Sequence, residues 1–224
     1  MGNAADPVLE KMRLDWDARA RENARYYVVN SQEDWTDDEF FEGGRKTVAA
    51  AILTDPHNIF QGKSPGEMKV LEIGCGAGRV TRAMAELFGE VQAVDVSGEM
   101  VRLAREACAG QSNVTIHHNN GRDLGDLSDS YFDFAFSSCC FQHIPSYDVI
   151  ESYVRETARV LKTGALFKFE VQGYVAMKPK PDDTWHGVPF STEQARDLAE
   201  RCGFEARHLV GAGTEDFWLW FFKR

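Results

Sequence analysis

A glycine-rich turn between a short apolar run and a helical pattern constrains the fold of this chain more than any other feature. Residues 70–73, Val-Leu-Glu-Ile, are typical of a short buried strand, and apolar residues recur at helical spacing over 80–87. Glycines at 74, 76 and 78 separate the two patterns. Positions without a side chain let a ligand lie against the backbone, beside the N–H groups that open the helix. The turn therefore predicts a strand–turn–helix unit with a ligand site.

The alternation of strands and helices continues along the chain. Further strands are predicted over residues 91–96, 114–118, 132–137 and 165–171, with helices from the expected N-cap Ser97 and around 150–161. Such alternation implies a parallel sheet that is covered on both faces and joined by right-handed crossovers. A helix over 191–202 precedes two glycine-linked strands, 204–210 and 217–222, which predict an antiparallel hairpin. We therefore expect a doubly wound α/β fold with a mostly parallel, seven-stranded sheet.

Two helices are predicted before the first strand. Apolar residues recur at helical spacing over residues 7–27, and Thr36-Asp37-Asp38-Glu39 has the form of a capping box that begins a helix over 36–53. Aromatic residues gather in this part of the chain: Trp16, Tyr26, Tyr27, Trp35, Phe40 and Phe41. They form either a cover over a site or a core that packs the helices on the sheet, and the sequence leaves both interpretations open.

Composition narrows the class of protein. A chain of 224 residues can bury one sizeable core, so we expect a single domain. The formal net charge of -10 at pH 7 disfavours nucleic acid as a partner. The N-terminal residues have no basic or apolar signal, and no apolar run approaches the roughly 18 residues of a membrane span, so we expect a cytoplasmic protein without membrane contact. The oligomeric state stays open.

The cysteines do not indicate a metal or redox site. They are five, an odd number, and they lack C-x-x-C spacing, so reduced thiols are the simplest expectation. The segment from Cys140 to His143 could supply half of a metal site, but no second half is visible. We expect no required metal.

Asp95 is predicted to bind two adjacent ribose hydroxyls. It ends the second strand, at the carboxyl edge of the sheet, where open α/β sheets bind their ligands. The dinucleotide fingerprint needs a small residue where Arg79 stands, and the phosphate-loop motif is absent, so neither of those sites is indicated.

With these residues the sequence resembles the class I S-adenosylmethionine-dependent methyltransferases, over about residues 66–171. Glu72-x-Gly74-x-Gly76-x-Gly78 is similar to the first motif of that family, which holds the methionine end of the cofactor. Asp95 falls where the family keeps its ribose-binding acid. Asn120 stands where many members carry an Asp that accepts from the adenine amino group, and an Asn carbonyl can do the same.

Two later segments extend the resemblance. Residues 132–138 with 142–145 are similar to the fourth motif, and 159–164 resembles the R-V-L-K-P-G turn, with Thr163 in place of proline. The N-P-P-aromatic signature of members that methylate amide or base nitrogens is missing, because Ser-Ser-Cys-Cys stands at 137–140. Methylation of bases and of glutamine is therefore disfavoured.

The resemblance implies a Rossmann-like methyltransferase that uses S-adenosylmethionine and moves its methyl group to a small-molecule or peptide acceptor by in-line displacement. It divides the single domain, 1–224, into a helical cover (1–60), a cofactor-binding core (66–171) and a substrate-side loop, helix and hairpin (172–224). The cofactor-binding residues expected are Glu72, Gly74, Cys75, Gly76, Gly78, Asp95, Val96, Met100, Asn120, Gly121, Arg122, Ser137 and Tyr26.

The substrate side of the expected site rests on four residues. His143 is the candidate general base, because it follows the fourth strand and its side chain titrates near neutral pH. A histidine that only packs on the cofactor or starts a helix fits the sequence equally well. Trp16, Tyr27 and His186 are the candidate substrate contacts. The acceptor atom stays unassigned.

Two other classes of protein fit parts of the sequence. Tyr174 and Lys178 have the Y-x-x-x-K spacing of nicotinamide-dependent short-chain dehydrogenases, but Pro179 and Pro181 would break the long helix that those enzymes need. A non-catalytic module that keeps the fold and the cofactor is the other alternative, and the intact glycines and Asp95 argue against it.

Overall fold

The computed structural model describes residues 6–125, 127–176 and 183–224. The strands among them form one seven-stranded sheet in the order β3-β2-β1-β4-β5-β7-β6. The strands are β1 (Lys69–Ile73), β2 (Glu90–Asp95), β3 (Val114–His118), β4 (Phe132–Ser137), β5 (Leu161–Val171), β6 (Phe204–Val210) and β7 (Phe217–Lys223). The first five strands pair in parallel, whereas β7 runs antiparallel to both β5 and β6. The predicted fold class is confirmed, including the terminal hairpin.

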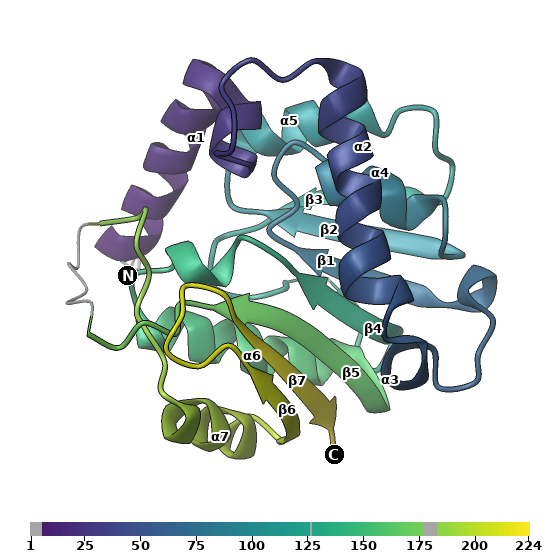
Figure 1. Cartoon of the computed structure of the whole chain (residues 1–224), viewed down its shortest axis with the longest axis vertical. Coiled ribbons are helices and arrows are strands. Elements are labelled where there is room, and N and C mark those ends of the chain that lie inside the picture. Colours follow the sequence, from purple (N-terminus) through teal and green to yellow (C-terminus); the bar gives the residue numbers. More distant parts are fainter. Residues whose placement is uncertain (1–5, 126, 177–182) are drawn as a thin grey trace, which may run out of the picture.

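Helices cover both faces of this sheet. They are α1 (Pro7–Val28), α2 (Asp37–Val48), α3 (Pro56–Phe60), α4 (Arg79–Ala85), α5 (Gly98–Ala107), α6 (Tyr147–Val160) and α7 (Thr192–Arg201). Figure 1 shows α2 beside α4 on one side of the sheet, and α6 with α7 on the other. Serine side chains cap α5, α6 and α7, as the Ser97 hydroxyl does when it accepts from the Met100 amide at 3.1 Å.

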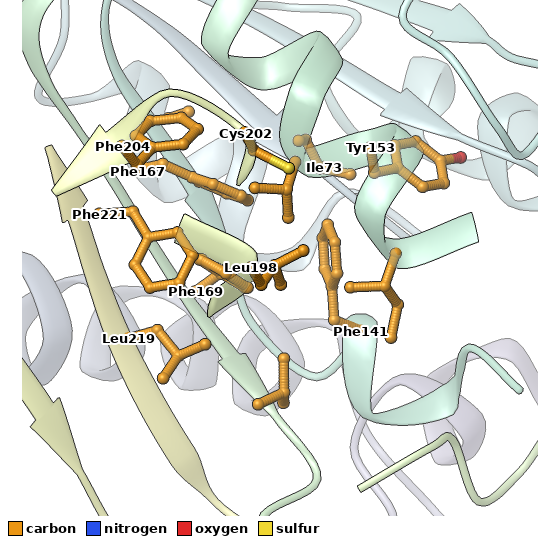
Figure 2. Packing of buried hydrophobic residues seen from close by; sticks show 14 of the residues in the cluster. Ile73, Phe141, Tyr153, Phe167, Phe169, Leu198, Cys202, Phe204, Leu219 and Phe221 are labelled. Atoms are coloured by element: carbon orange, nitrogen blue, oxygen red, sulfur yellow. The ribbon is translucent and has the colours of Figure 1, made fainter. Parts of the chain in front are cut away.

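The two faces of the sheet carry separate hydrophobic clusters. One lies under α6 and α7, where Phe167 and Phe169 stack with ring centroids 4.1 Å apart and pack toward Phe141 and Leu198 (Figure 2). The other lies under α2, α3 and α4 and includes Leu166 of the same strand. Neighbouring residues of β5 serve opposite faces, and the strand is buried on both sides from Ala165 onward. Lys168 and Glu170 are its buried charged residues.

The segment predicted as one helix over 36–53 is two different structures. The helix α2 ends at Val48, and Ala49–Leu53 forms a π-helical turn, after which α3 follows without having been predicted. The Lys168 ammonium reaches this turn from β5 and donates to the Ala51 carbonyl at 2.6 Å.

The last parallel strand also begins earlier than predicted. The structure starts β5 at Leu161 rather than 165, because Phe132 and Leu161 already pair before the register shifts between Phe132 and Phe134. The expected turn at 159–164 is thus divided between the end of α6 and an irregular start of β5. No helix among the described residues is long and apolar enough to cross a membrane.

Candidate functional site

A cavity opens at the carboxyl ends of β1, β2 and β4, with about 800 Å³ of space free of protein atoms, part of it continuous with solvent. Residues of the β1–α4 turn and of the end of β2 line one side, and α1 closes it from the other. The cavity lining includes Met12, Trp16, Tyr27, Val28, Glu72, Gly74, Cys75, Gly76, Arg79, Asp95, Val96, Met100, Cys139, Cys140, His143 and Tyr153. Ten of the residues predicted from the sequence are in this set.

At two glycines of the β1–α4 turn, an added Cβ would meet a neighbouring side chain of the protein. Gly76 has φ +52°, and a Cβ there would lie 2.8 Å from Val28 Cγ2 of α1. A Cβ on Gly74 would overlap the Cys140 side chain. Gly78 serves another purpose, because a Cβ there would lie 3.1 Å from the Ala104 Cα, and so it allows α4 to pack on α5. Of the three predicted glycines, Gly74 and Gly76 face the cavity.

Asp95 links the glycine turn to the start of α5. Its Oδ2 accepts from the Gly76 amide at 2.8 Å, and its Oδ1 accepts from the Ser97 amide at 2.9 Å. Burial raises the pKa of this carboxyl above its usual value, while the two amides act in the opposite direction. Each oxygen keeps a further lone pair for a hydroxyl donor, which is what ribose binding requires.

Glu72 is a buried carboxyl at the other side of the turn. It is 3% exposed, and its Oε2 accepts from the Thr81 hydroxyl at 2.5 Å. Burial raises the pKa of Glu72 to about 8, so that the group is mostly protonated at pH 7. A cation placed beside it would favour the ionised form.

His143 lies between two indole rings and is neutral at physiological pH. Its ring centroid is 5.2 Å from that of Trp16 and 4.9 Å from that of Trp185. Nδ1 lies 2.5 Å from the Trp185 carbonyl oxygen, which can only accept, so Nδ1 carries the proton and Nε2 keeps its lone pair. Burial lowers the pKa of His143 to about 4.

The helix α1 is fastened to the sheet by a buried acid that sequence reasoning missed. Asp17 is 6% exposed, and its Oδ1 accepts from the Ser97 hydroxyl at 2.7 Å and from the Glu99 amide at 3.1 Å. A carboxylate at this position also complements the positive end of the ten-residue helix α5. Nothing in the local pattern around Asp17 distinguishes it from the other charged residues of α1.

A second set of contacts joins α1 to the loop over 183–187. Thr184 donates its hydroxyl to Asp15 Oδ2 at 2.6 Å and accepts from Arg19 at 3.0 Å. The Arg19 guanidinium lies over the rings of Trp16 and Trp185, at 4.8 Å and 5.4 Å from their centroids. These residues hold the loop against the mouth of the cavity.

Besides Gly78, six predicted site residues are outside the cavity lining. Asn120 is engaged in its own turn, because its Oδ1 accepts from the amides of Arg122 and Asp123 at 2.9 Å and 3.0 Å. The Arg122 side chain pairs with Asp6 on the surface. Gly121 packs on Val96, which does line the cavity.

The other three have local partners. The Ser137 hydroxyl donates to the Ile73 carbonyl at 2.7 Å and so ties β4 to β1. Tyr26 packs edge-on against Tyr27, with ring centroids 5.2 Å apart. His186 is exposed and pairs with Asp183 at 2.9 Å. These positions make His186 a surface residue of the loop rather than a wall of the cavity.

A second cavity lies between the π-helical turn and the face of β5 and β7. Its buried Lys168 is satisfied within the chain, since it pairs with Asp55 at 3.3 Å, and Trp220 donates to the same carboxylate at 2.6 Å. Cys139 lines both cavities, and its amide donates to Glu170. The loop after β4 therefore separates the two spaces.

Among the residues that it describes, the structure does not group those that would indicate a dehydrogenase or a metal site. Tyr174, from the Y-x-x-x-K spacing, is exposed and is not part of a helix, while Lys178 lies outside the described residues. Within the part of the chain that the structure describes, no three His, Cys, Asp or Glu side chains are grouped as metal ligands.

Comparison with known proteins finds similarity over the middle part of the chain. The model of a family described as "Methyltransferase domain" matches residues 71–169. The demethylmenaquinone methyltransferase of Tropheryma whipplei (strain Twist) is 34% identical over 103 residues, which are 46% of this chain and 41% of the relative. That of Staphylococcus aureus (strain MRSA252) is 31% identical over 102 residues. The chain thus matches less than half the length of these relatives.

Solved structures resemble the whole chain. Magnesium protoporphyrin IX methyltransferase from Synechocystis PCC 6803, with bound S-adenosylmethionine, has a TM-score of 0.67 at 16% identity over 100% of both chains. Phosphoethanolamine N-methyltransferase 1 from Haemonchus contortus, in complex with phosphoethanolamine and S-adenosylhomocysteine, has a TM-score of 0.71 at 12% identity and covers 99% of this chain and 50% of that one. Residues 71–169 therefore match a methyltransferase domain, and the chain has the Rossmann-like fold of these solved methyltransferases.

Proposed function

We propose that this chain binds S-adenosylmethionine and transfers the methyl group to a small-molecule or peptide acceptor by direct in-line displacement. The observation that carries the proposal is the cavity at the carboxyl ends of β1, β2 and β4, which the β1–α4 turn and Asp95 line together and where Asp95 accepts from the Gly76 amide. A cavity with a buried carboxylate at the carboxyl edge of the sheet fits a ligand that carries ribose hydroxyls. The match of the methyltransferase domain over 71–169 supports the same function.

The residues of the cavity would hold the cofactor in a fixed order. Asp95 would accept from the ribose hydroxyls, while Val96 and Met100 would pack against the adenine ring. The cofactor supplies a methyl group on a positively charged sulfur, and its transfer needs orientation and exclusion of water more than a covalent enzyme intermediate. Trp16 and Tyr27 of α1 supply the apolar wall that excludes water.

His143 is the proposed base for an acceptor that must lose a proton. Its Nδ1 is committed to the Trp185 carbonyl, so Nε2 is the atom that can take the proton. Because burial holds the pKa near 4, the base form is present throughout the physiological range. The same burial makes it a weak base, which suits an acceptor that gives up its proton only as the new bond forms.

The acceptor is proposed only as a class. The relatives named above act on very different molecules, and the net charge of -10 opposes a nucleic-acid acceptor. The cover of residues 1–60, the closing of α1 over the cofactor and a cytoplasmic location stay predictions.

Calorimetric titration with S-adenosylhomocysteine, followed by a methyl-transfer assay on candidate acceptors, tests the function. We expect a single site with micromolar or tighter affinity, and slower transfer in a His143→Gln variant that binds the cofactor normally. Absence of binding by the intact chain would disprove the proposal. Binding without transfer to any acceptor would favour the non-catalytic module.

A further inference from the structure

The second cavity is a larger space than the cofactor cavity, and nothing in the proposed function uses it. It has about 1260 Å³ free of protein atoms, part of it continuous with solvent. It lies between the end of α2, the π-helical turn and α3 on one side and the strands β5, β7 and β6 on the other (Figure 1). Its lining combines ionisable side chains with two half-buried indole rings: Asp55, Lys168, Glu170, His208, Asp216, Trp218 and Trp220. A cavity with an aromatic wall and a few charged groups is typical of a small-molecule site.

Glu170 is a buried group of this cavity that the chain satisfies only in part. It is 4% exposed, and its Oε1 accepts from the Ser138 hydroxyl at 3.1 Å and from the Cys139 amide. Among the described residues, its Oε2 has no hydrogen-bond partner, and no cation lies within ion-pair distance of it. Burial raises the pKa of this carboxyl, and the nearby Asp216 acts in the same direction. A positively charged donor in the cavity would complete this group.

The lining of the second cavity holds more acid than base. Lys168 and Asp55 pair at 3.3 Å, and the ammonium also donates to the Ala51 carbonyl at 2.6 Å, so this pair is complete within the chain. Asp216 lies near enough to Glu170 to raise its pKa and, within the part of the chain that the structure describes, has no ion-pair partner. The two remaining carboxyl groups therefore favour a cation over an anion.

The two indole rings give a cation an aromatic wall. Trp218 and Trp220 are half-buried, and the Lys168 ammonium lies 4.4 Å from the centroid of the Trp220 ring. His208 meets the same ring edge-on, with ring centroids 6.0 Å apart. Indole faces attract ammonium groups and bury apolar substituents, whereas a metal ion needs several oxygen ligands, which an aromatic wall does not supply. The lining therefore fits an ammonium group attached to an apolar body.

We propose that the second cavity binds an organic ammonium ion, with the ammonium group on Glu170 Oε2 and the apolar body against Trp218. The site is separate from the cofactor cavity, because the loop after β4 lies between the two spaces. Binding there requires neither the cofactor nor methyl transfer, so the site goes beyond the proposed function. The two cavities meet at Cys139, which lines both and whose amide donates to Glu170.

Two small molecules of the same shape and different charge test this site. Phenethylamine carries an ammonium group at neutral pH, whereas phenethyl alcohol carries a neutral hydroxyl on the same body. Titration calorimetry should give a Kd of about 1 mM or lower for the amine, as expected for a ligand of so few atoms, and at least about tenfold weaker binding of the alcohol. An excess of S-adenosylhomocysteine, which fills the cofactor cavity, should leave both affinities unchanged.

Glu170→Gln keeps an acceptor for the Ser138 hydroxyl and the Cys139 amide but removes the charge. It should weaken the amine about tenfold to a hundredfold and the alcohol less than about threefold. Asp216→Asn removes an exposed charge, so it should weaken the amine only about twofold to fivefold. It provides the measurement if Glu170→Gln does not fold, which thermal melts establish. Glu200→Gln, exposed on α7 at the other side of the sheet, is the matched control and should change neither affinity.

Three results would overturn the site: no binding of the amine by the intact chain, equal affinity for amine and alcohol, or unchanged affinity in the folded cavity variants. Loss of amine binding in excess S-adenosylhomocysteine would also overturn it, because the amine would then occupy the cofactor cavity. So would an equal loss in Glu200→Gln, since the net charge of -10 would then attract the amine without a site. Absence of cofactor binding would disprove the proposed function and leave the amine site intact.

Discussion

The floor and the cover of the cofactor cavity are built in different ways. The floor, which we define as residues 72–79 and 95–100, is held by its own backbone: the amides of Gly74 and Cys75 donate to the Val94 carbonyl at 2.9 Å and 3.1 Å. The cover, helix α1, is held by side chains such as Asp17 and Arg19. Its bonds join residues 80 to 169 positions apart in the chain.

This difference separates a part that sets geometry from a part that can open. Backbone bonds within the sheet break only when the sheet unfolds, whereas side-chain bonds on one helix can break together while the sheet stays folded. The helix α1 also has a non-helical residue, Asn23, at φ -162° and ψ 83°, so its last turn is already set apart from the rest. We expect cofactor affinity to depend mainly on the floor, and exclusion of water mainly on the cover.

Gly76→Val would break the floor and should have the largest effect. The branched side chain would occupy the space of Val28 and of the ligand, on a backbone at φ +52° that L side chains rarely adopt. We expect calorimetry to detect no cofactor binding, with only moderate loss of stability. Gly110→Val is the control, because nothing lies within 4 Å of a Cβ there. Normal affinity in a folded Gly76→Val protein would mean that the turn serves packing alone.

Removal of residues 1–29 deletes the cover and leaves the floor. If α1 closes the site, the truncated protein should bind the cofactor weakly and transfer methyl groups very slowly, because water reaches the reacting atoms. If α1 is only core, stability should fall by about 25 cal/mol per Å² of lost apolar burial, and the cofactor site should be spared. Thermal melts with and without S-adenosylmethionine separate these outcomes. A truncated protein with the full cofactor-induced shift would refute the cover.

Asp95→Ala removes one polar contact of the floor without adding bulk. Two charge-assisted hydrogen bonds at about 1.5 to 3 kcal/mol each set the scale, and partial replacement by water suggests a loss of roughly tenfold to a hundredfold in affinity. Calorimetry with both S-adenosylmethionine and its demethylated product measures it. Asp197→Ala, on the exposed face of α7, is the control. Unchanged affinity in Asp95→Ala would remove the ribose assignment.

Glu72→Gln tests the floor through the pH dependence of stability, and its effect should be the smallest of these four changes. The folded pKa of Glu72, about 8, is raised above its ordinary value of 4.5, so its contribution to stability is complete below pH 4.5 and is lost as the pH rises through 8. Glutamine cannot ionise. Between pH 5 and pH 8.5 the melting temperature of the parent protein should fall by several degrees more than that of the variant, because linkage for a carboxyl with these two pKa values changes by roughly 4 kcal/mol over this range. Parallel melting curves would show that Glu72 does not ionise in this range.

The floor could be predicted from the sequence because its signals are local. The glycines, Asp95 and the apolar strand patterns all lie within a few residues of the structure that they specify. The tautomer of His143 could not be predicted from the sequence, because it depends on the carbonyl of Trp185, 42 residues away.

The helix over residues 7–27 could be predicted from its apolar spacing, but the contacts that hold it could not. The sequence around Asp17 and Thr184 gives no sign of their role. The fold brings Ser97 to Asp17 and Asp15 to Thr184, and these hydrogen bonds hold the helix. Asn120 shows the reverse limit: its place in the motif predicted a contact with adenine, whereas its side chain is engaged by the amides of its own turn. Motif position identifies which loop borders the site, and tertiary packing decides which atoms of that loop are free.

Ser97 lies between the two regions and has a bond to each. Its amide donates to Asp95 and its hydroxyl donates to Asp17, so a single residue joins the ribose acid to the helix that closes the cavity. Linkage between two binding events is reciprocal: if a docked α1 tightens the hold on the ligand by some factor, the ligand must tighten the docking of α1 by the same factor. The protection of α1 against hydrogen exchange would then rise with cofactor concentration, and the helix that closes the cavity would report its occupancy.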